Sequence, residues 1–146
     1  MHSEKNPTEI ARKILNENIH LTLATFDSKP WATPVYYCSD DKFNIYFTSK
    51  PDSLHGQHIA KNPEVSFAIY DSKKYQNGIQ GIGSIKILKG KEILAALKWY
   101  KTDFMKLSLK TLSGLASYRL YKITSEHIFI QDPNKSSDKR IEVAIA

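Results

Sequence analysis

The apolar pattern near the N-terminus has the period of an amphipathic helix. Apolar side chains recur at helical spacing at Ile10, Ala11, Ile14 and Leu15. Asn6 is a suitable N-cap, Pro7 fits the first helical position, and Glu9 follows the cap as in a capping box. The sequence therefore predicts a short helix over residues 7–17.

After this helix, the period of the apolar residues changes to the alternation of β-strands. Strands are expected over residues 19–26, 31–38 and 43–47, with polar turns at 27–30 and 39–42 between them. Short polar turns between β-rich segments are typical of an antiparallel meander.

The rest of the chain combines helices with further β-segments. We expect helices over 54–61 and 91–105, strands over 65–69 and 79–88, and a final β pair over about 117–124 and 127–131, whereas 107–114 fit no clear pattern. Short β-segments with intervening helices predict a mainly β, α+β fold: a six-stranded antiparallel split β-barrel with flanking helices. We expect one domain over residues 1–146, with flexible tails at 1–6 and 133–146.

Composition narrows the class of protein without identifying it. The 146 residues are 41% hydrophobic and 25% charged, which is ordinary for a soluble globular domain. The net charge of +6 favours anionic partners such as phosphate esters, nucleic acid or a membrane surface. The single cysteine, Cys38, suits a reducing cytosol, and no apolar run has the length of a signal peptide or a membrane span. We therefore expect a cytoplasmic protein that does not enter a membrane.

The polar loop before the predicted helix at 54–61 is the first candidate for chemistry. It offers three hydroxyls, one cation and an imidazole, from Thr48, Ser49, Ser53, Lys50 and His55. The N–H groups and the dipole at a helix N-terminus favour an anion, and a phosphate in particular. An ordinary capped helix with a solvated lysine explains the same residues, so both interpretations stay open.

Two β-segments hold the other candidates. Pro34 cannot donate a ladder hydrogen bond, so it must lie on an edge strand, at a bulge, or where something else approaches the backbone. Beside it, Thr33 and Val35 offer a polar and an apolar contact that suit the side of a planar heteroaromatic ring. In the glycine-rich strand, Gln80 could pair with polar edge atoms of such a ring and Gly81 allows close approach. A ligand-free edge strand and a solvent-facing glutamine are equally consistent.

Other patterns favour structural roles. His55 and His58 have a spacing that can bind a metal, but no further ligand pair accompanies them, so no metal site is expected. Cys38 is interpreted as a structural thiol, and the catalytic residues stay unassigned because no acid–base pair or nucleophile stands out. The basic residues are dispersed, which leaves a nucleic-acid-binding barrel as the least favoured alternative.

In order and spacing, these segments resemble the pyridoxamine 5′-phosphate oxidase-like family of FMN-binding split barrels. The matching segments are LATFDSKPWATPVYY at 23–37, IYFTSKPDSLH at 45–55, HIAKNPEVSFAI at 58–69 and IQGIG at 79–83, with a weaker similarity in LYKITSEHIFIQD at 120–132. Each motif is degenerate alone, but their order and spacing together are fairly specific.

The resemblance implies a flavin site and a way of assembling it. It assigns contacts with the isoalloxazine to Thr33, Pro34 and Val35, contacts with the ribityl chain and phosphate to Thr48, Ser49, Lys50, Ser53 and His55, and further ring contacts to Gln80 and Gly81. Members are typically homodimers with the flavin between subunits. We therefore expect a homodimer with the cofactor at the subunit interface.

The resemblance also implies an activity, an FMN-dependent oxidoreductase of unknown substrate. Many flavin-binding members carry Arg-Lys where this chain has Leu54 and His55, and the segment by which the true oxidase recognises pyridoxal is missing. Vitamin B6 oxidation is therefore not expected. Relatives of this size bind haem or a deazaflavin, so a non-catalytic flavin- or haem-binding module for storage, sensing or transfer is the alternative.

Overall fold

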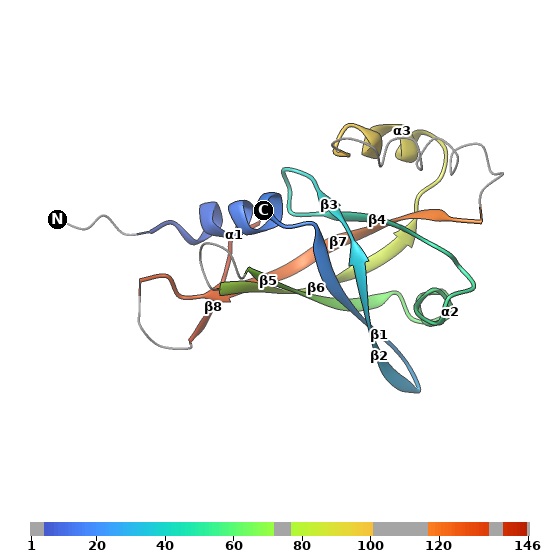
Figure 1. Cartoon of the computed structure of the whole chain (residues 1–146), viewed down its shortest axis with the longest axis horizontal. Coiled ribbons are helices and arrows are strands. Elements are labelled where there is room, and N and C mark those ends of the chain that lie inside the picture. The colour runs from blue at the N-terminus through green and yellow to red at the C-terminus, as the bar shows by residue number, and fades with distance from the viewer. Residues whose placement is uncertain (1–4, 72–76, 101–116, 135–138, 146) are drawn as a thin grey trace.

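A computed structural model of the chain describes residues 5–71, 77–100, 117–134 and 139–145. These described residues form three helices and eight strands, which Figure 1 labels in the order α1 (Pro7–Glu17), β1 (His20–Asp27), β2 (Lys29–Tyr36), β3 (Cys38–Ser39), β4 (Ile45–Ser49), α2 (Leu54–Lys61), β5 (Glu64–Asp71), β6 (Asn77–Ile87), α3 (Lys91–Leu97), β7 (Arg119–Gln131) and β8 (Arg140–Glu142). None of the described helices is long and apolar enough to span a bilayer.

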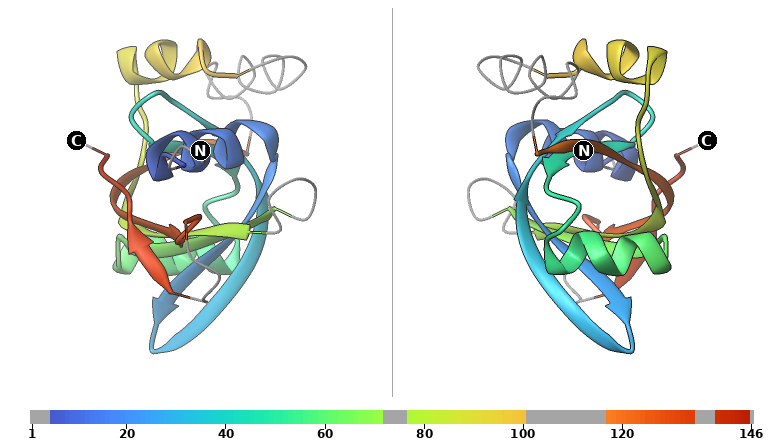
Figure 2. Two further views of the ribbon diagram at one scale, coloured as in Figure 1. Left: turned by 90° about the vertical axis from the view of Figure 1, so that its left-hand side faces the viewer. Right: turned by 90° about the vertical axis from the view of Figure 1, so that its right-hand side faces the viewer.

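The strands form one antiparallel sheet that curls into a split barrel. Its order is β2-β1-β5-β6-β7-β4-β3, and β8 pairs with β7 outside this path. β2 and β3 lie at opposite edges, yet only Tyr37 separates them in the chain. The polypeptide therefore passes directly from one edge to the other, and the end-on views of Figure 2 show the strands curving around a central space. The predicted α+β split barrel is confirmed, whereas the predicted number of six strands is wrong.

The helices follow the signals in the sequence where local chemistry decides them. The Asn6 side chain caps α1 by accepting hydrogen bonds from the N–H groups of Thr8 and Glu9. α2 has the predicted bounds, with Ser53 as its N-cap and Asn62 as its C-cap. α3 ends at Leu97, and the backbone then makes hydrogen bonds between residues three apart, as in a 3₁₀ turn. The predicted helix over 91–105 is therefore too long. Residues 101–105 and the unassigned 107–114 lie outside the described residues.

The predicted final β pair is a single strand with a bulge. In the ladder between β6 and β7, Ile82 faces His127 but Gly83 faces Ser125, so Glu126 is the extra residue. Ser125 holds this irregularity in place because its N–H donates to the Asn44 side chain and its hydroxyl donates to the Phe43 carbonyl. A polar Thr-Ser-Glu run that resembles a turn is thus accommodated inside a strand.

The barrel core consists of residues on the inner face of the sheet. One row of it runs across four strands through Leu23, Phe67, Gly81 and Ile128. Apolar residues of α1, among them Ile14, close one side of this core, and the Tyr37 hydroxyl donates to the Leu15 carbonyl. α1 and α3 lie on one side of the curled sheet, and α2 lies on the opposite side (Figure 2).

The C-terminal segment differs from the expected flexible tail. Residues 140–142 form β8 on β7, and the Val143 N–H donates to the Ile128 carbonyl. The Val143 side chain is buried in the main core. At the other end, the Lys5 backbone exchanges two hydrogen bonds with the Asn134 side chain.

This packing predicts that the C-terminal segment stabilises the barrel. We expect Val143→Asp to lower the free energy of unfolding by more than about 3 kcal/mol, because it places an unpaired carboxylate in the core. Ala144→Asp, at an exposed position next to it, should change that value by less than about 0.5 kcal/mol. Urea unfolding of both variants checks the prediction, and equal stabilities would show that β8 contributes nothing to the core.

Candidate functional site

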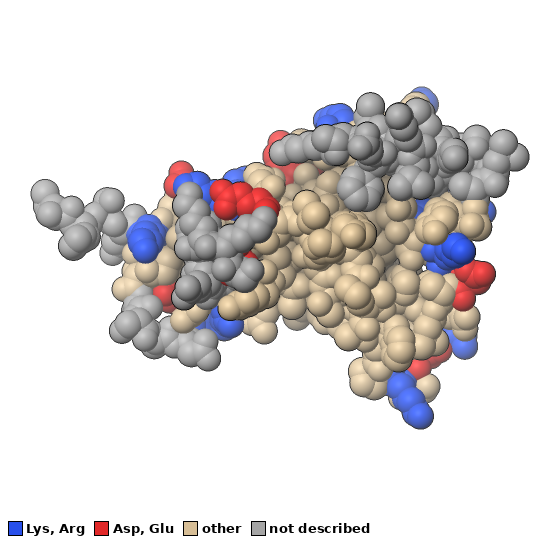
Figure 3. Space-filling view, in the orientation of Figure 1, with Lys and Arg blue, Asp and Glu red and all other residues tan. Residues whose placement is uncertain are grey.

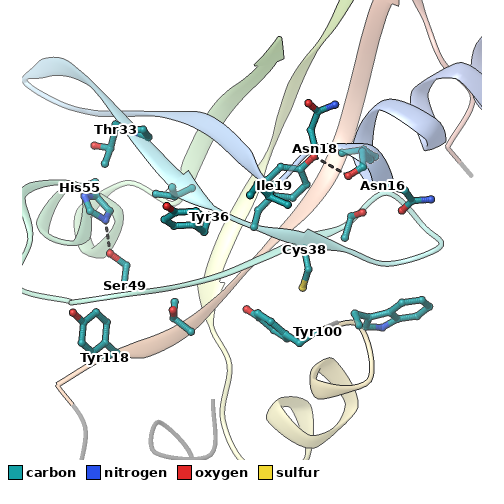
Figure 4. A pocket seen from close by; sticks show the side chains of 17 residues that line it. Asn16, Asn18, Ile19, Thr33, Tyr36, Cys38, Ser49, His55, Tyr100 and Tyr118 are labelled. Atoms are coloured by element: carbon teal, nitrogen blue, oxygen red, sulfur yellow. Dashed lines mark hydrogen bonds between the residues drawn. The ribbon is translucent and has the colours of Figure 1, made fainter. Parts of the chain in front are cut away.

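A cavity of about 620 Å³ lies in the split of the barrel, between the unpaired sides of β2 and β4. β2 supplies residues 33–36 to its wall, and β4 supplies Thr48 and Ser49. Residues of α1, of β3 and of the segment after α3 line the far end. The volume is in the range of small-molecule binding sites. Figure 4 shows Thr33, Ser49, His55 and Tyr118 at one end, which we call the hydroxyl end, and Asn16, Asn18, Cys38 and Tyr100 at the other.

The structure brings together six of the ten residues that the sequence assigned to a cofactor. Those that line this cavity are Thr33, Pro34, Val35, Thr48, Ser49 and His55. Lys50 and Ser53 lie in the loop directly behind the hydroxyl end but do not line the cavity, and Gln80 and Gly81 lie elsewhere. β2 is an edge strand, which explains how Pro34 is tolerated in it.

The hydroxyl end is held together by hydrogen bonds between its own side chains. His55 Nε2 lies 2.5 Å from Ser49 Oγ and 3.3 Å from Ser53 Oγ. Ser53 Oγ also accepts from the Gly56 N–H and donates to the Lys50 carbonyl. The loop between β4 and α2 is therefore fixed to the first turn of α2. This arrangement combines the capped helix and the candidate anion site, which sequence reasoning treated as alternatives.

Gly56 is required for the close approach of this loop to the helix. A Cβ at this position would lie 2.5 Å from the Pro51 carbonyl oxygen and 2.7 Å from that of Lys50. Lys50 itself is exposed, and its Nζ lies 5.5 Å from the centre of the Tyr118 ring. Because Tyr118 lines the cavity, this ammonium group sits beside the hydroxyl end.

The hydroxyl of Thr33 is the feature of the cavity that points most directly to a ligand. Its Oγ1 is buried and has no hydrogen-bond partner among the described residues, although Thr33 lines the cavity. A buried hydroxyl without a partner costs about 1–3 kcal/mol, which a ligand with a polar edge would recover. Apolar walls with a few polar groups fit the ring system of a flavin. The anionic phosphate of FMN fits less closely, because the described lining residues include no lysine or arginine.

Gln80 and Gly81 lie on different faces of the sheet. Gln80 is exposed on the outer face, in a row with Thr22, Ala68 and Phe129 that lines a separate hollow of about 340 Å³. Gly81 is in the inner row, where a Cβ would lie 2.1 Å from Cζ of the Phe67 ring. Packing of Phe67 therefore explains this glycine without any ligand. Within one chain, neither residue reaches the cavity in the split.

The far end of the cavity contains residues that sequence reasoning did not assign to a site. Trp99 and Tyr100 provide aromatic walls and Asn16 and Asn18 provide amides, while Tyr36 lies between the two ends (Figure 4). Trp99 and Tyr100 were expected inside a longer helix, with their side chains on its apolar face. Of these residues, only Tyr36 could have been assigned to the cavity from the sequence, because it follows Val35 on the same predicted strand.

Two buried histidines on α2 link the helix to two different strands. His55 contacts Ser49 on β4, and His58 Nδ1 lies 3.0 Å from Thr25 Oγ1 on β1. Burial lowers the pKa of His55 below its ordinary value of 6.5, and the charge of a protonated His58 lowers it further. His55 is therefore a neutral hydrogen-bonding group at pH 7. The described residues contain no cluster of three or more groups placed to hold a metal ion.

The fold and this cavity define a split-barrel protein with a candidate ligand site in the split between β2 and β4. The chain belongs to the pyridoxamine 5′-phosphate oxidase family, whose model matches residues 7–132. This confirms the resemblance noted in the sequence. A search of curated protein sequences finds no match.

Several solved structures share the fold at low sequence identity. A haem-binding protein from Mycobacterium smegmatis is 18% identical with a TM-score of 0.75, over 97% of this chain and 60% of that one. An FAD-binding protein from Mesorhizobium loti is 20% identical with a TM-score of 0.65, over 88% and 95%. A NimC/NimA family protein from Clostridium acetobutylicum is 15% identical with a TM-score of 0.62, over 93% and 90%. This chain thus spans about three-fifths of the haem-binding protein.

The lowered pKa of His55 predicts how stability depends on pH. Because the folded state holds His55 neutral, the unfolded state binds more protons once the pH falls towards 6.5. The free energy of unfolding should therefore fall as the pH drops through 6.5 and level off below the folded-state pKa. Urea unfolding between pH 8 and about pH 5 measures it.

His55→Gln should remove this part of the pH dependence, since glutamine does not titrate. His20→Gln, at an exposed histidine on β1, is the matched control and should retain it. A His55→Gln protein whose stability declines as steeply as that of the wild type would contradict the assignment.

Proposed function

We propose that this protein binds FMN in the cavity between β2 and β4 and uses it as a flavin-dependent oxidoreductase. The observation that carries the proposal is the buried Thr33 hydroxyl without a described partner, on the wall of a 620 Å³ cavity with aromatic and apolar lining. Membership of the pyridoxamine 5′-phosphate oxidase family supports it, as does the similarity in fold to the FAD-binding protein from Mesorhizobium loti.

Under this proposal, each part of the hydroxyl end has a distinct task. Thr33, Pro34 and Val35 on β2 contact the flavin ring, with the Thr33 hydroxyl bonded to its polar edge. Thr48 and Ser49 face the ribityl chain. Lys50 supplies positive charge towards the phosphate, and neutral His55 supplies a hydrogen bond. The flavin, when bound, supplies the hydride or electron transfer, while the protein binds, orients and shields it.

Haem is the second candidate ligand, because the cavity contains a buried imidazole and a haem-binding protein shares the fold. The bond between His55 Nε2 and Ser49 argues against it, since an iron ligand must present a free ring nitrogen. An absorption spectrum distinguishes the two ligands, because haem has a Soret band near ~400 nm and flavin a band near ~450 nm.

We further propose that two copies of this chain assemble through the outer faces of β1, β5 and β6. The small and uncharged side chains of Thr22, Ala24, Ser66 and Ala68 surround the hollow there, and Ile82 is exposed beside them. Figure 3, in the orientation of Figure 1, shows that uncharged side chains cover the middle of the visible face of the molecule and that the charged ones lie mainly around its edge. A second copy would also bring Gln80 into reach of a flavin bound to its partner.

The site makes a prediction that separates ring contacts from phosphate contacts. Thr33→Val should weaken FMN and riboflavin equally, by about fivefold, because it removes one hydrogen bond to the ring. Lys50→Ala should weaken FMN by about tenfold and leave riboflavin unchanged, because riboflavin has no phosphate. Quenching of flavin fluorescence during titration gives the dissociation constants.

Lys42→Ala is the control for net charge, because Lys42 is an exposed lysine in the turn before β4. It should bind both ligands like the wild type. Equal affinity of the unmodified protein for FMN and riboflavin, together with no effect of Thr33→Val, would contradict this placement of the cofactor. Steady oxidation of NAD(P)H by the FMN complex tests the oxidoreductase activity separately.

The proposed dimer makes a prediction of its own. Ala68→Arg introduces a long cation in the middle of the outer face, so it should give a monomer and weaken FMN by at least about tenfold. Ala60→Arg, the same change at an exposed position of α2, should leave the dimer intact. Sedimentation equilibrium measures the mass, and a monomeric wild-type protein would contradict the proposal.

A further inference from the structure

The far end of the cavity has a chemistry different from that of the hydroxyl end. In Figure 4, Asn16, Asn18, Cys38 and Tyr100 lie on the side away from Thr33 and His55. Trp99 also lines this end. If FMN occupies the hydroxyl end, as proposed above, this end is the part of the cavity in which a second molecule can meet it.

We infer that this far end is the substrate site, and that it takes an uncharged, planar aromatic molecule with a hydrogen-bonding group. This inference rests on the proposed function and specifies its substrate class. It follows from three features of the described residues: the absence of charge on the lining, the aromatic walls, and the position of the amides.

Charge is the most selective of these features. The described lining residues include no Asp, Glu, Lys or Arg. A charged ligand would lose its hydration there without gaining a counterion, which costs much more than burying a neutral one. The site therefore discriminates against carboxylates, phosphates and ammonium groups.

Of the nearby charged side chains, those of Arg12, Asp40 and Lys98 have partners in the structure. Arg12, Asp40 and Asp41 line a smaller pocket that shares Asn16 and Trp99 with the cavity. Arg12 donates to the Asp41 carbonyl and lies over the Phe43 ring, and Asp40 accepts from the Asn44 amide and the Tyr46 hydroxyl. Lys98 lies over Trp99 with its ammonium 5.0 Å from the ring centre, and does not line the cavity.

The walls and amides specify shape and orientation. Trp99 and Tyr100 present rings at this end, and Tyr36 presents another between the two ends, which favours flat apolar ligands. Asn18 uses its NH₂ group to donate to the Ile14 carbonyl, so its oxygen remains as an acceptor. The amide of Asn16 is exposed on the last turn of α1 at the edge of the cavity and offers both a donor and an acceptor.

A matched pair of probes tests this inference, 2-naphthamide and 2-naphthoate, which share size and planarity but differ in charge. With FMN bound, 2-naphthamide should bind about tenfold more tightly than 2-naphthoate, measured by calorimetric titration. Trp99→Ala should weaken 2-naphthamide by about tenfold. Asn16→Lys should reverse the preference by giving the carboxylate a counterion, whereas Gln57→Lys, with the same change in charge on α2, should not.

The outcomes separate this inference from the proposed function. If the protein binds FMN but binds both probes with equal affinity, the substrate site is overturned and the flavin site stands. The same holds if the protein prefers 2-naphthamide and Asn16→Lys leaves that preference unchanged. Failure to bind FMN overturns the proposed function, and the substrate assignment falls with it. If the protein binds FMN, prefers 2-naphthamide to 2-naphthoate, and reverses that preference in Asn16→Lys, the result supports both the flavin site and the substrate site.

Discussion

The passage of the chain through Tyr37 from one edge of the sheet to the other determines the rest of the structure. The Tyr37 N–H donates to the Ile19 carbonyl at 2.9 Å, as the last bond on the β1 side, and Cys38 then pairs with Tyr46 on β4. The buried Tyr37 hydroxyl donates to the Leu15 carbonyl at 2.8 Å and so fixes α1 to the same point. Because one residue joins the two edges, β2 and β3 leave it on opposite sides of the split, and β4, which pairs with β3, does not pair with β2. The cavity is the consequence of that divergence.

This constraint also explains why the polar groups of the site come from adjacent but unpaired strands. On the β2 wall, no described side chain reaches the Thr33 hydroxyl, which keeps a buried oxygen without a described partner. On the other side of the split, Ser49 is satisfied only because α2 brings His55 to it. The split thus has one wall on which Ser49 is hydrogen-bonded and one wall on which the Thr33 hydroxyl has no described partner, and under the proposed function a ligand with a polar edge would complete the second wall.

The sequence predicted best what local chemistry determines, and least what depends on pairing between distant strands. The bounds of α1 and α2 follow from Asn6, Ser53 and Asn62, whose side chains and backbones make the capping bonds. The strand count was too low because β3 and β8 are short strands that exist only through pairing with β4 and β7. In the opposite direction, β7 was predicted as two strands because Thr124-Ser125-Glu126 has the composition of a turn, and contacts with Phe43 and Asn44 keep it in one strand. Gly81 was assigned to a ligand because a glycine signals close approach, but the approaching group is the Phe67 ring. The aromatic end of the cavity could not be predicted, since it depends on where α3 ends.

The distribution of charge around the cavity has a consequence for how an anionic cofactor is held. In the described part of the chain, no lysine or arginine lines the cavity, and burial keeps His55 neutral at pH 7. His55 can therefore donate or accept a hydrogen bond but cannot neutralise a phosphate. The guanidinium that many relatives carry at the position of Leu54 would donate hydrogen bonds and also supply a positive charge. Lys50 lies outside the wall, over Tyr118, where water screens its charge. Under the proposed function, the cofactor would be held by the shape of the cavity and by neutral hydrogen bonds, with Lys50 as the one described cation beside the phosphate. The same neutral lining would determine which second molecule can enter beside the cofactor.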